Sequence, residues 1–174
     1  MSPEVRGSPI EIAFLPDLRA RGGRLLSGRG EQGKEVHAGS FLRERRIVLD
    51  SALRRRPREL RRVLTHEIFH FAWLRLGNPR RREWEALLRR EIHGGVRGEL
   101  GWSAELRKSV LFSYPAPGNN QPKWRDYACE SFCDTAAWLY SGIARHREFT
   151  LAERHRKRRK EWFLATFQGR QIPI

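Results

Sequence analysis

The chain has few cysteines and no long apolar run, and each shortage argues against a class of protein. Its only cysteines, Cys129 and Cys133, are too few for a disulfide framework, and their spacing on one predicted helix disfavours a bond between them. No segment approaches the ~20 apolar residues of a membrane span. Residues 1–9 contain no apolar signal-peptide core. We therefore expect a reducing, cytoplasmic setting and no membrane partner.

The charge of the chain is strongly positive, with 35 basic and 20 acidic residues and a formal net charge of +15. Five of the basic residues are lysine and the other thirty are arginine. Such a skew can follow from genome base composition as well as from selection for phosphate contacts. Because the charge is spread along the chain, it favours acidic partners without deciding a function. The length of 174 residues and the hydrophobic content of 39% suit one folded domain, 1–174.

The most informative segment is the H-E-x-x-H sequence at 66–70, inside a helix predicted over 57–76. Pro57 suits the first helical position, and residues 77–79 end the helix. Two histidines four residues apart lie on one face of a helix, where both imidazoles can bind one Zn²⁺ ion. Glu67 then lies beside the metal and can accept a proton from a water that the metal activates.

A chance match is the alternative interpretation of this short sequence. The helix is apolar nearly all round from Val63 to Leu76, so it should be largely buried. Three titratable side chains buried there without partners would cost several kcal/mol. Because a bound metal ion would remove that cost, we favour a metal site over a coincidence.

A second helix, predicted over 126–140 and closed by Gly142, supplies two further candidates. Glu130 and Asp134 are four residues apart and therefore share one face. A solvated acidic face would need exposed neighbours, and most of the neighbouring residues are small and apolar. Glu130 is therefore the expected third zinc ligand, which leaves the fourth position for water. Asp134 can accept a hydrogen bond from the second nitrogen of a zinc-bound histidine.

The sequences H-E-x-x-H at 66–70 and E-x-x-x-D at 130–134 resemble those of the gluzincin group of zinc metallopeptidases. The short chain looks like the compact, minigluzincin type of catalytic domain. The resemblance implies an α+β, zincin-like fold, in which a short mixed or antiparallel N-terminal sheet packs on an active-site helix and a glutamate helix, with further helices. It implies Zn²⁺ as the cofactor and a peptide or protein as the substrate.

The resemblance also implies a role for each residue of the site. His66, His70 and Glu130 would be the metal ligands, Glu67 the general base, and Asp134 the hydrogen-bond partner of a ligand. Larger members of the group stabilise the oxyanion with an additional His or Tyr, for which this chain offers four candidates: His93, Tyr114, Tyr127 and Tyr140.

The remaining segments predict the rest of the fold. Strands are expected at 10–15, 35–41 and 45–49, a glycine-rich loop at 21–34, another loop at 114–122, and helices at 80–92, 103–112 and 150–167. The resemblance implies that the strand before the active-site helix, 46–50, holds substrate at a sheet edge. An ordinary core strand fits the same residues equally well.

Two other functions remain open. In the first, a non-catalytic zinc site stabilises a basic domain that binds nucleic acid or an acidic partner through residues 154–160, a run too charged to be buried. A solvated helix face explains that run at least as well. In the second, a peptidase is kept latent by its own tail or by the loop 114–122. The substrate, cleavage preference and oligomeric state are left open.

Overall fold

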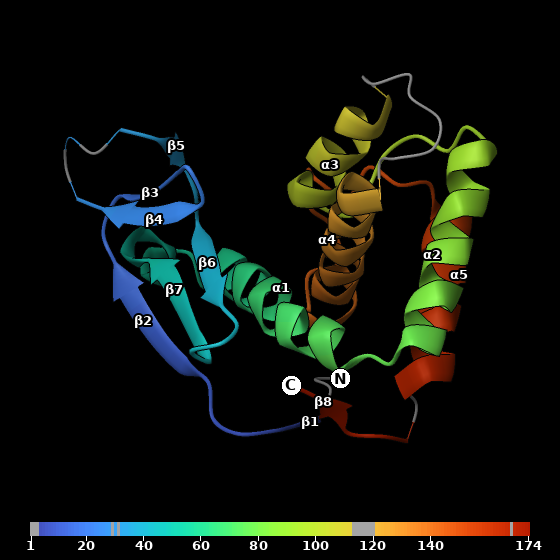
Figure 1. Cartoon of the computed structure of the whole chain (residues 1–174), viewed down its shortest axis with the longest axis horizontal. Helices are drawn as coiled ribbons and strands as arrows, with labels where there is room; N and C mark the ends of the chain where they lie inside the picture. The colour runs from blue at the N-terminus through green and yellow to red at the C-terminus, as the bar shows by residue number, and fades with distance from the viewer. Residues whose placement is uncertain (1–3, 29, 31, 113–120, 168) are drawn as a thin grey trace.

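The computed structural model describes residues 4–28, 30, 32–112, 121–167 and 169–174. In this part of the chain, five α-helices lie beside two three-stranded sheets, and one further pair of strands joins the termini (Figure 1). The predicted α+β class is confirmed. None of the described helices combines the length and the apolar character that crossing a membrane requires.

The elements follow one another with short connections. The strands are β1 (Val5–Arg6), β2 (Glu11–Leu15), β3 (Leu18–Arg21), β4 (Arg24–Ser27), β5 (Lys34–Glu35), β6 (Ala38–Phe41), β7 (Arg46–Asp50) and β8 (Ile172–Pro173). The helices are α1 (Pro57–Arg75), α2 (Asn78–His93), α3 (Trp102–Phe112), α4 (Gln121–Tyr140) and α5 (Glu153–Phe167), with a 3₁₀ helix, η1 (Ser51–Arg55), before α1.

The sheet next to α1 has the strand order β2-β7-β6, with β2 parallel and β6 antiparallel to β7. Its central strand β7 carries three buried residues in a row, Ile47, Val48 and Leu49, as expected for a strand covered on both faces. The prediction that 46–50 forms a substrate-binding edge is therefore wrong, and the core-strand alternative is correct. The edge that contacts α1 is β6.

The second sheet has the order β4-β3-β5. Its β3–β4 hairpin turns at Gly22 and Gly23, whose φ angles of 57° and 76° favour glycine. The sequence predicted a loop at 21–34. The glycine turn was predicted correctly, but the strands β4 and β5 within this range were not. The strand predicted at 35–41 is divided, because β5 pairs with β3 whereas β6 pairs with β7.

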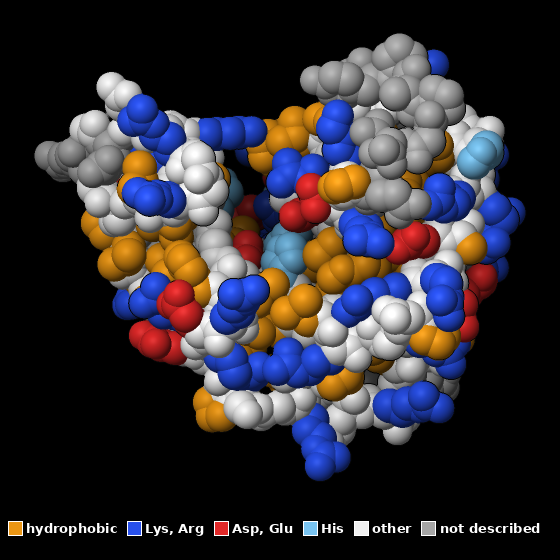
Figure 2. Space-filling view, viewed as in Figure 1, with side chains coloured by type: hydrophobic (Ala, Val, Ile, Leu, Met, Phe, Trp, Pro, Cys, Tyr) orange, Lys and Arg blue, Asp and Glu red, His pale blue; other side chains and the backbone are white. Residues whose placement is uncertain are grey.

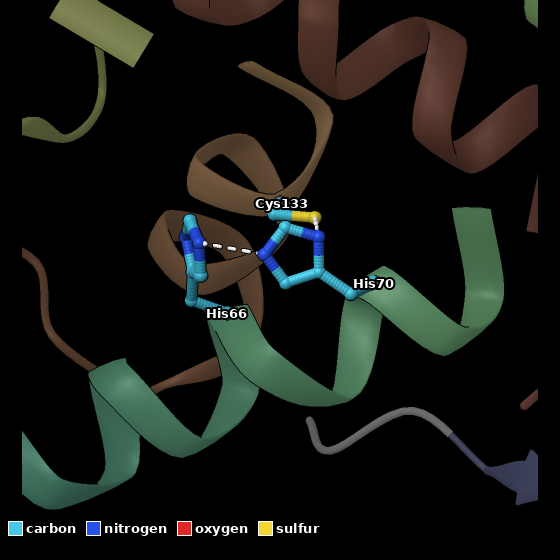
Figure 3. A group of neighbouring side chains, drawn as sticks. All are labelled: His66, His70 and Cys133. Atoms are coloured by element: carbon cyan, nitrogen blue, oxygen red, sulfur yellow. Dashed lines mark hydrogen bonds between the residues drawn. The ribbon is translucent and has the colours of Figure 1, made fainter. Parts of the chain in front are cut away.

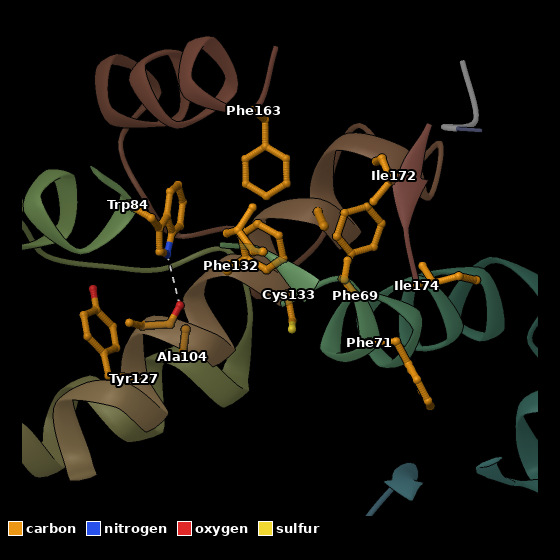
Figure 4. Packing of buried hydrophobic residues seen from close by; sticks show 14 of the residues in the cluster. Phe69, Phe71, Trp84, Ala104, Tyr127, Phe132, Cys133, Phe163, Ile172 and Ile174 are labelled. Carbon is orange, nitrogen blue, oxygen red and sulfur yellow. Dashed lines mark hydrogen bonds between the residues drawn. The ribbon is translucent and has the colours of Figure 1, made fainter. Parts of the chain in front are cut away.

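The main core lies between the helices and is rich in aromatic rings (Figure 4). The ring of Phe132 on α4 lies 5.8 Å from Phe69 on α1 and 5.0 Å from Phe163 on α5. Trp84 on α2 is fully buried, and its indole N–H donates to the carbonyl of Ala128 at 3.0 Å. One aromatic cluster thus fixes α1 against α4, with α2 and α5 behind them.

The basic run 154–160 contains a residue whose burial the sequence did not predict. Arg159 is fully buried, with nitrogens 2.6 Å from a Glu91 oxygen and 2.7 Å from a Glu99 oxygen. The expectation that this run cannot be buried is wrong here, because two carboxylates neutralise the guanidinium. Arg156 donates to the carbonyls of Phe149 and Leu151. The basic surface of α5 is therefore smaller than the sequence suggested.

The start of α5 also differs from its prediction. The helix begins at Glu153 rather than at Thr150, and the Thr150 hydroxyl accepts a hydrogen bond from the amide of Glu99 at 3.0 Å. A contact with a distant segment thus replaces a local helix cap.

The two ends of the chain lie side by side in Figure 1, where β8 pairs in parallel with β1. Ile172 and Ile174 pack into the aromatic core together with Phe69. This arrangement lends no support to a tail that covers the metal site. Most of the loop predicted at 114–122 lies outside the described residues, and its last two residues belong to α4.

Candidate metal centre

The two histidines of the H-E-x-x-H sequence point their Nε2 atoms at each other across one turn of α1 (Figure 3). These nitrogens are 3.2 Å apart. Two imidazole ligands ~2.0–2.1 Å from a tetrahedral zinc ion have nitrogens about 3.3 Å apart. The observed separation therefore matches two nitrogens that share one ion.

Glu130 reaches the same place from α4. Its Oε2 lies 3.3 Å from Nε2 of His66, which is again the separation of two donors on one small ion. The helices α1 and α4 form the largest helix–helix contact of the fold, and this contact sets the position of the carboxylate. The structure thus places one donor atom of His70 and one of Glu130 close to Nε2 of His66.

Asp134 lies one turn further along α4 and is almost fully buried. Its Oδ1 is 2.7 Å from Nδ1 of His66, and its Oδ2 accepts a hydrogen bond from the amide of Ala104 at 2.9 Å. A carboxylate in this position keeps the proton of His66 on Nδ1 and leaves Nε2 free for a metal. This is the contact predicted for Asp134.

Gly101 explains how the Asp134 carboxylate fits against the segment before α3. A Cβ atom at position 101 would lie 2.1 Å from Cγ of Asp134 and 2.2 Å from its Oδ1. No side chain can occupy that space unless the carboxylate moves. The absence of a side chain at this position therefore supports the contact between Asp134 and His66.

The cysteines lie on the other side of His70, which the sequence did not indicate. The sulfurs of Cys129 and Cys133 are each 3.5 Å from Nδ1 of His70. Both thiols are free, and their four-residue spacing places them on one face of α4, beside the face of Glu130. The spacing that disfavours a disulfide also allows both sulfurs to contact one shared partner.

A second ligand set is possible, because donor atoms of His66, His70 and Cys133 lie within 4.8 Å of one another. The Cys133 sulfur, however, contacts Nδ1 of His70, whereas Nε2 of that ring faces His66. The Glu130 oxygen lies 3.3 Å from Nε2 of His66. Glu130 is therefore the candidate third ligand on the Nε2 side, and the cysteines contact the opposite nitrogen of the His70 ring.

Glu67 follows the first histidine and is buried. The hydroxyl of Ser40, on the edge strand β6, donates to Oε2 of Glu67 at 2.6 Å. The carboxylate is thereby held between α1 and the free edge of the sheet. Ser40 carried no signal in the sequence, because its role arises from the pairing of β6 with β7.

Burial and the neighbouring charged groups shift the pKa values of the side chains in this cluster. Burial lowers the pKa of His66, but Asp134 and Glu130 outweigh it and raise that pKa well above its usual value. Burial also lowers the pKa of His70, yet the neighbouring Cys129 raises it to about 9. For Glu130, burial raises the pKa, and the two histidines lower it to about 2. The cluster thus favours positive charge on its histidines and negative charge on Glu130.

A cavity of about 410 Å³ opens beside the metal centre. His66 and Glu67 form one wall, the segment from β5 to β6 forms another, and Trp102 and Arg147 lie opposite. In Figure 2 this region is the hollow between the two parts of the molecule, with a histidine and acidic side chains at its bottom. Glu67 therefore borders a space large enough for an amino-acid side chain.

Three of the four oxyanion candidates are engaged elsewhere. Tyr127 donates to Glu99 at 2.6 Å, Tyr140 stacks on Phe69 at 5.5 Å, and Nδ1 of His93 lies 2.7 Å from the carbonyl of Arg89. Tyr114 lies outside the described residues. The three described candidates are therefore poor ones.

A second group of ligand-type residues, Glu59, His146 and Glu148, lies near the start of α1. Arg62 already binds both carboxylates, with nitrogens 3.1 Å from Glu59 and 3.0 Å from Glu148. Burial raises the pKa of Glu59, but Arg62 outweighs it and lowers that pKa. The guanidinium supplies the cation here, so this group is an ion-pair cluster.

A scan against protein-family models finds no match for this chain, and searches of curated proteins and of solved structures find no significant similarity either. The two sequence motifs and the geometry of the site are therefore the only basis for inferring a function.

Proposed function

We propose that this protein is a zinc-dependent peptidase of the gluzincin type, with a small zincin-like fold. The observation that carries the proposal is the pair of separations of 3.2 and 3.3 Å that His66 Nε2 makes with His70 Nε2 and with Glu130 Oε2. Two imidazoles and one carboxylate form a ligand set typical of catalytic zinc, with a fourth position left open. We include the reducing, cytoplasmic setting in the proposal, which the free cysteines fit.

A zinc ion bound by His66, His70 and Glu130 would supply Lewis acidity and lower the pKa of a bound water to about 7. The protein supplies the base. Glu67 accepts a proton from the attacking water and then donates it to the amine that leaves. Ser40 holds the Glu67 carboxylate through its 2.6 Å hydrogen bond.

The substrate in this proposal is an extended peptide that pairs with the free edge of β6. An edge strand offers unpaired N–H and C=O groups to such a peptide. Because Ser40 on β6 contacts Glu67, a peptide on this edge would run past the base. In this proposal, the strand that binds substrate at its edge is therefore 38–41 rather than 46–50.

Metal analysis followed by a cleavage assay tests the proposal. The purified full chain should contain about one zinc per molecule, and His66→Ala, His70→Ala and Glu130→Ala should each lose it or bind it much more weakly. A peptide library incubated with the zinc-loaded chain should show cleavage that a chelator stops and added zinc restores. A chain that binds no zinc, or that cuts equally well without it, contradicts the proposal.

A further inference from the structure

The cavity beside Glu67 has an uneven distribution of paired and unpaired charges. Its carboxylates are all engaged: Glu35 binds Arg19 at 3.1 Å, and Glu148 accepts from Arg62 and from the Trp102 amide, each at 3.0 Å. The two carboxylates nearest the metal centre, described above, bind Ser40 and His66. Glu35 and Glu148 are thus paired with arginines, and Glu67 and Asp134 lie at the proposed metal centre.

Two basic side chains of the same cavity lack an acidic partner among the described residues. Arg147 lines the cavity and is exposed, and no hydrogen bond or ion pair joins it to the rest of the described chain. Lys34 places its ammonium 4.0 Å from the centre of the Trp102 ring, a contact that leaves its charge uncompensated. The open charge of the cavity is therefore positive.

The position of the cavity connects this charge with the reacting bond. Its walls include His66 and Glu67, so a substrate group inside it must be attached close to the bond that is cleaved. Val36, Ala38 and Val63 also line the cavity and can contact an aliphatic stem. The contact between Lys34 on β5 and Trp102 on α3 joins the sheet side to the helical side across the opening (Figures 1 and 2).

We propose that this cavity binds a carboxylate of the substrate through Arg147, assisted by Lys34, so that cleavage occurs beside an acidic residue or beside a free C-terminus. This inference rests on the proposed peptidase function. A guanidinium binds a carboxylate through two parallel hydrogen bonds, which the amide of glutamine cannot reproduce. Glutamate and glutamine have nearly the same shape, so their comparison isolates the charge.

Matched peptides test the proposal. One pair carries Glu or Gln at the positions that flank the cleaved bond, and a second pair ends in a free carboxylate or an amide. We expect the zinc-loaded chain to prefer at least one carboxylate form by about tenfold or more in kcat/KM, as charge-assisted hydrogen bonds usually supply. A preference in the first pair assigns the side chain, and one in the second assigns the C-terminus. Equal cleavage within both pairs overturns the inference while the peptidase function stands.

Substitutions connect the preference with Arg147. Arg147→Gln should bring the ratio for the preferred pair close to one, and Arg147→Glu should favour a lysine peptide instead. Arg145→Gln is the matched control, because Arg145 is an exposed neighbour that lines a separate hollow near Pro57 and should keep the preference. If Arg147→Gln keeps the full preference, the assignment to Arg147 is wrong.

A binding measurement separates this inference from the proposed function. Zinc-loaded Glu67→Gln should bind the carboxylate peptide more tightly than its neutral partner in calorimetry, and the additional substitution Arg147→Gln should abolish the difference. If the wild type cuts no peptide but this difference is found, the peptidase proposal fails and the carboxylate site remains. If neither peptide of either pair is preferred in binding, the carboxylate site is wrong.

Discussion

Two buried polar clusters of this molecule differ in how their carboxylate charges are balanced. Around Arg159, the carboxylates of Glu91 and Glu99 are balanced by the guanidinium and by Lys108, whose ammonium lies 3.1 Å from Glu99. Around His66, an imidazole nitrogen of His70 and a carboxylate oxygen of Glu130 face its Nε2, and among the described residues no Lys or Arg forms an ion pair with this group. The first cluster is complete and holds helices together, whereas the second has a place for an ion.

The largest effect that we expect comes from breaking the complete cluster. Arg159→Met removes the guanidinium from Glu91 and leaves Glu99 with Lys108 alone, and removing one partner of a buried ion pair typically costs about 3–5 kcal/mol. Thermal or denaturant unfolding measures this loss. Arg158→Met, at an exposed neighbour, is the control and should change stability by less than about 0.5 kcal/mol. An Arg159→Met variant as stable as the wild type would remove the structural role from this cluster.

The second prediction concerns the pH dependence of the metal-free chain. Despite burial, the Cys129 thiolate raises the folded pKa of His70 from 6.5 to about 9, and the pKa of Cys129 is about 6, so their ion pair stabilises the fold between these values and is lost as the pH rises through about 9. The loss should be on the order of 3 kcal/mol. Unfolding curves at several pH values measure it.

The zinc-loaded chain is the control for this pH dependence. A bound imidazole carries no proton on the metal-binding nitrogen, so stability in the same window should stay nearly constant. Equal pH dependence with and without zinc would show that the metal does not replace these protons.

A third substitution reaches the metal centre without changing any of its polar side chains. Gly101→Ala places a Cβ atom where the Asp134 carboxylate lies, so it should weaken zinc binding about as much as Asp134→Asn. Loss of such a partner typically costs ~10–100-fold in metal affinity or activity. Competition with a chelator measures the affinity.

The matched control for Gly101→Ala is Gly77→Ala. A Cβ atom at position 77 meets only Pro79, at an ordinary contact distance of 3.7 Å, so zinc affinity should not change. If Gly101→Ala and Asp134→Asn both bind zinc like the wild type, Asp134 does not support the site.

The smallest effect is expected for nucleic-acid binding. With Arg159 buried, neutralising Arg154, Lys157 and Arg158 should remove only weak binding that declines steeply with salt, because phosphate contacts release counterions. Filter binding or fluorescence anisotropy at two salt concentrations measures this. A tight, sequence-selective complex at physiological salt would favour the binding-protein alternative instead.

The sequence predicted which side chains of the candidate site lie close together better than it predicted the sheets. His66, His70, Glu130 and Asp134 could be paired because helical spacing alone puts each pair on one face, and only the packing of α1 on α4 had to be assumed. The α1 start at Pro57 and the α+β class were also predicted correctly.

The parts that were missed depend on contacts between distant segments. Whether β7 is central or at an edge depends on β2 and β6, which pair with it from both sides. The burial of Arg159 depends on Glu91 and Glu99, 68 and 60 residues away in the chain. Neither arrangement produces a pattern in the local sequence. A run of charged residues, for example, has the same sequence whether or not a distant carboxylate neutralises one of its members.

The most direct test of the central claim is a comparison of zinc content and peptide cleavage in wild type and Glu67→Gln. Glutamine keeps the shape of the side chain and can hydrogen-bond a water, but it cannot accept the proton. We predict zinc content and thermal stability close to those of the wild type, with cleavage reduced by at least the ~10²–10⁴-fold that general-base catalysis supplies. The substrate must be one that the wild type cuts. If Glu67→Gln cuts it equally well, Glu67 is not the base and the proposed mechanism is wrong.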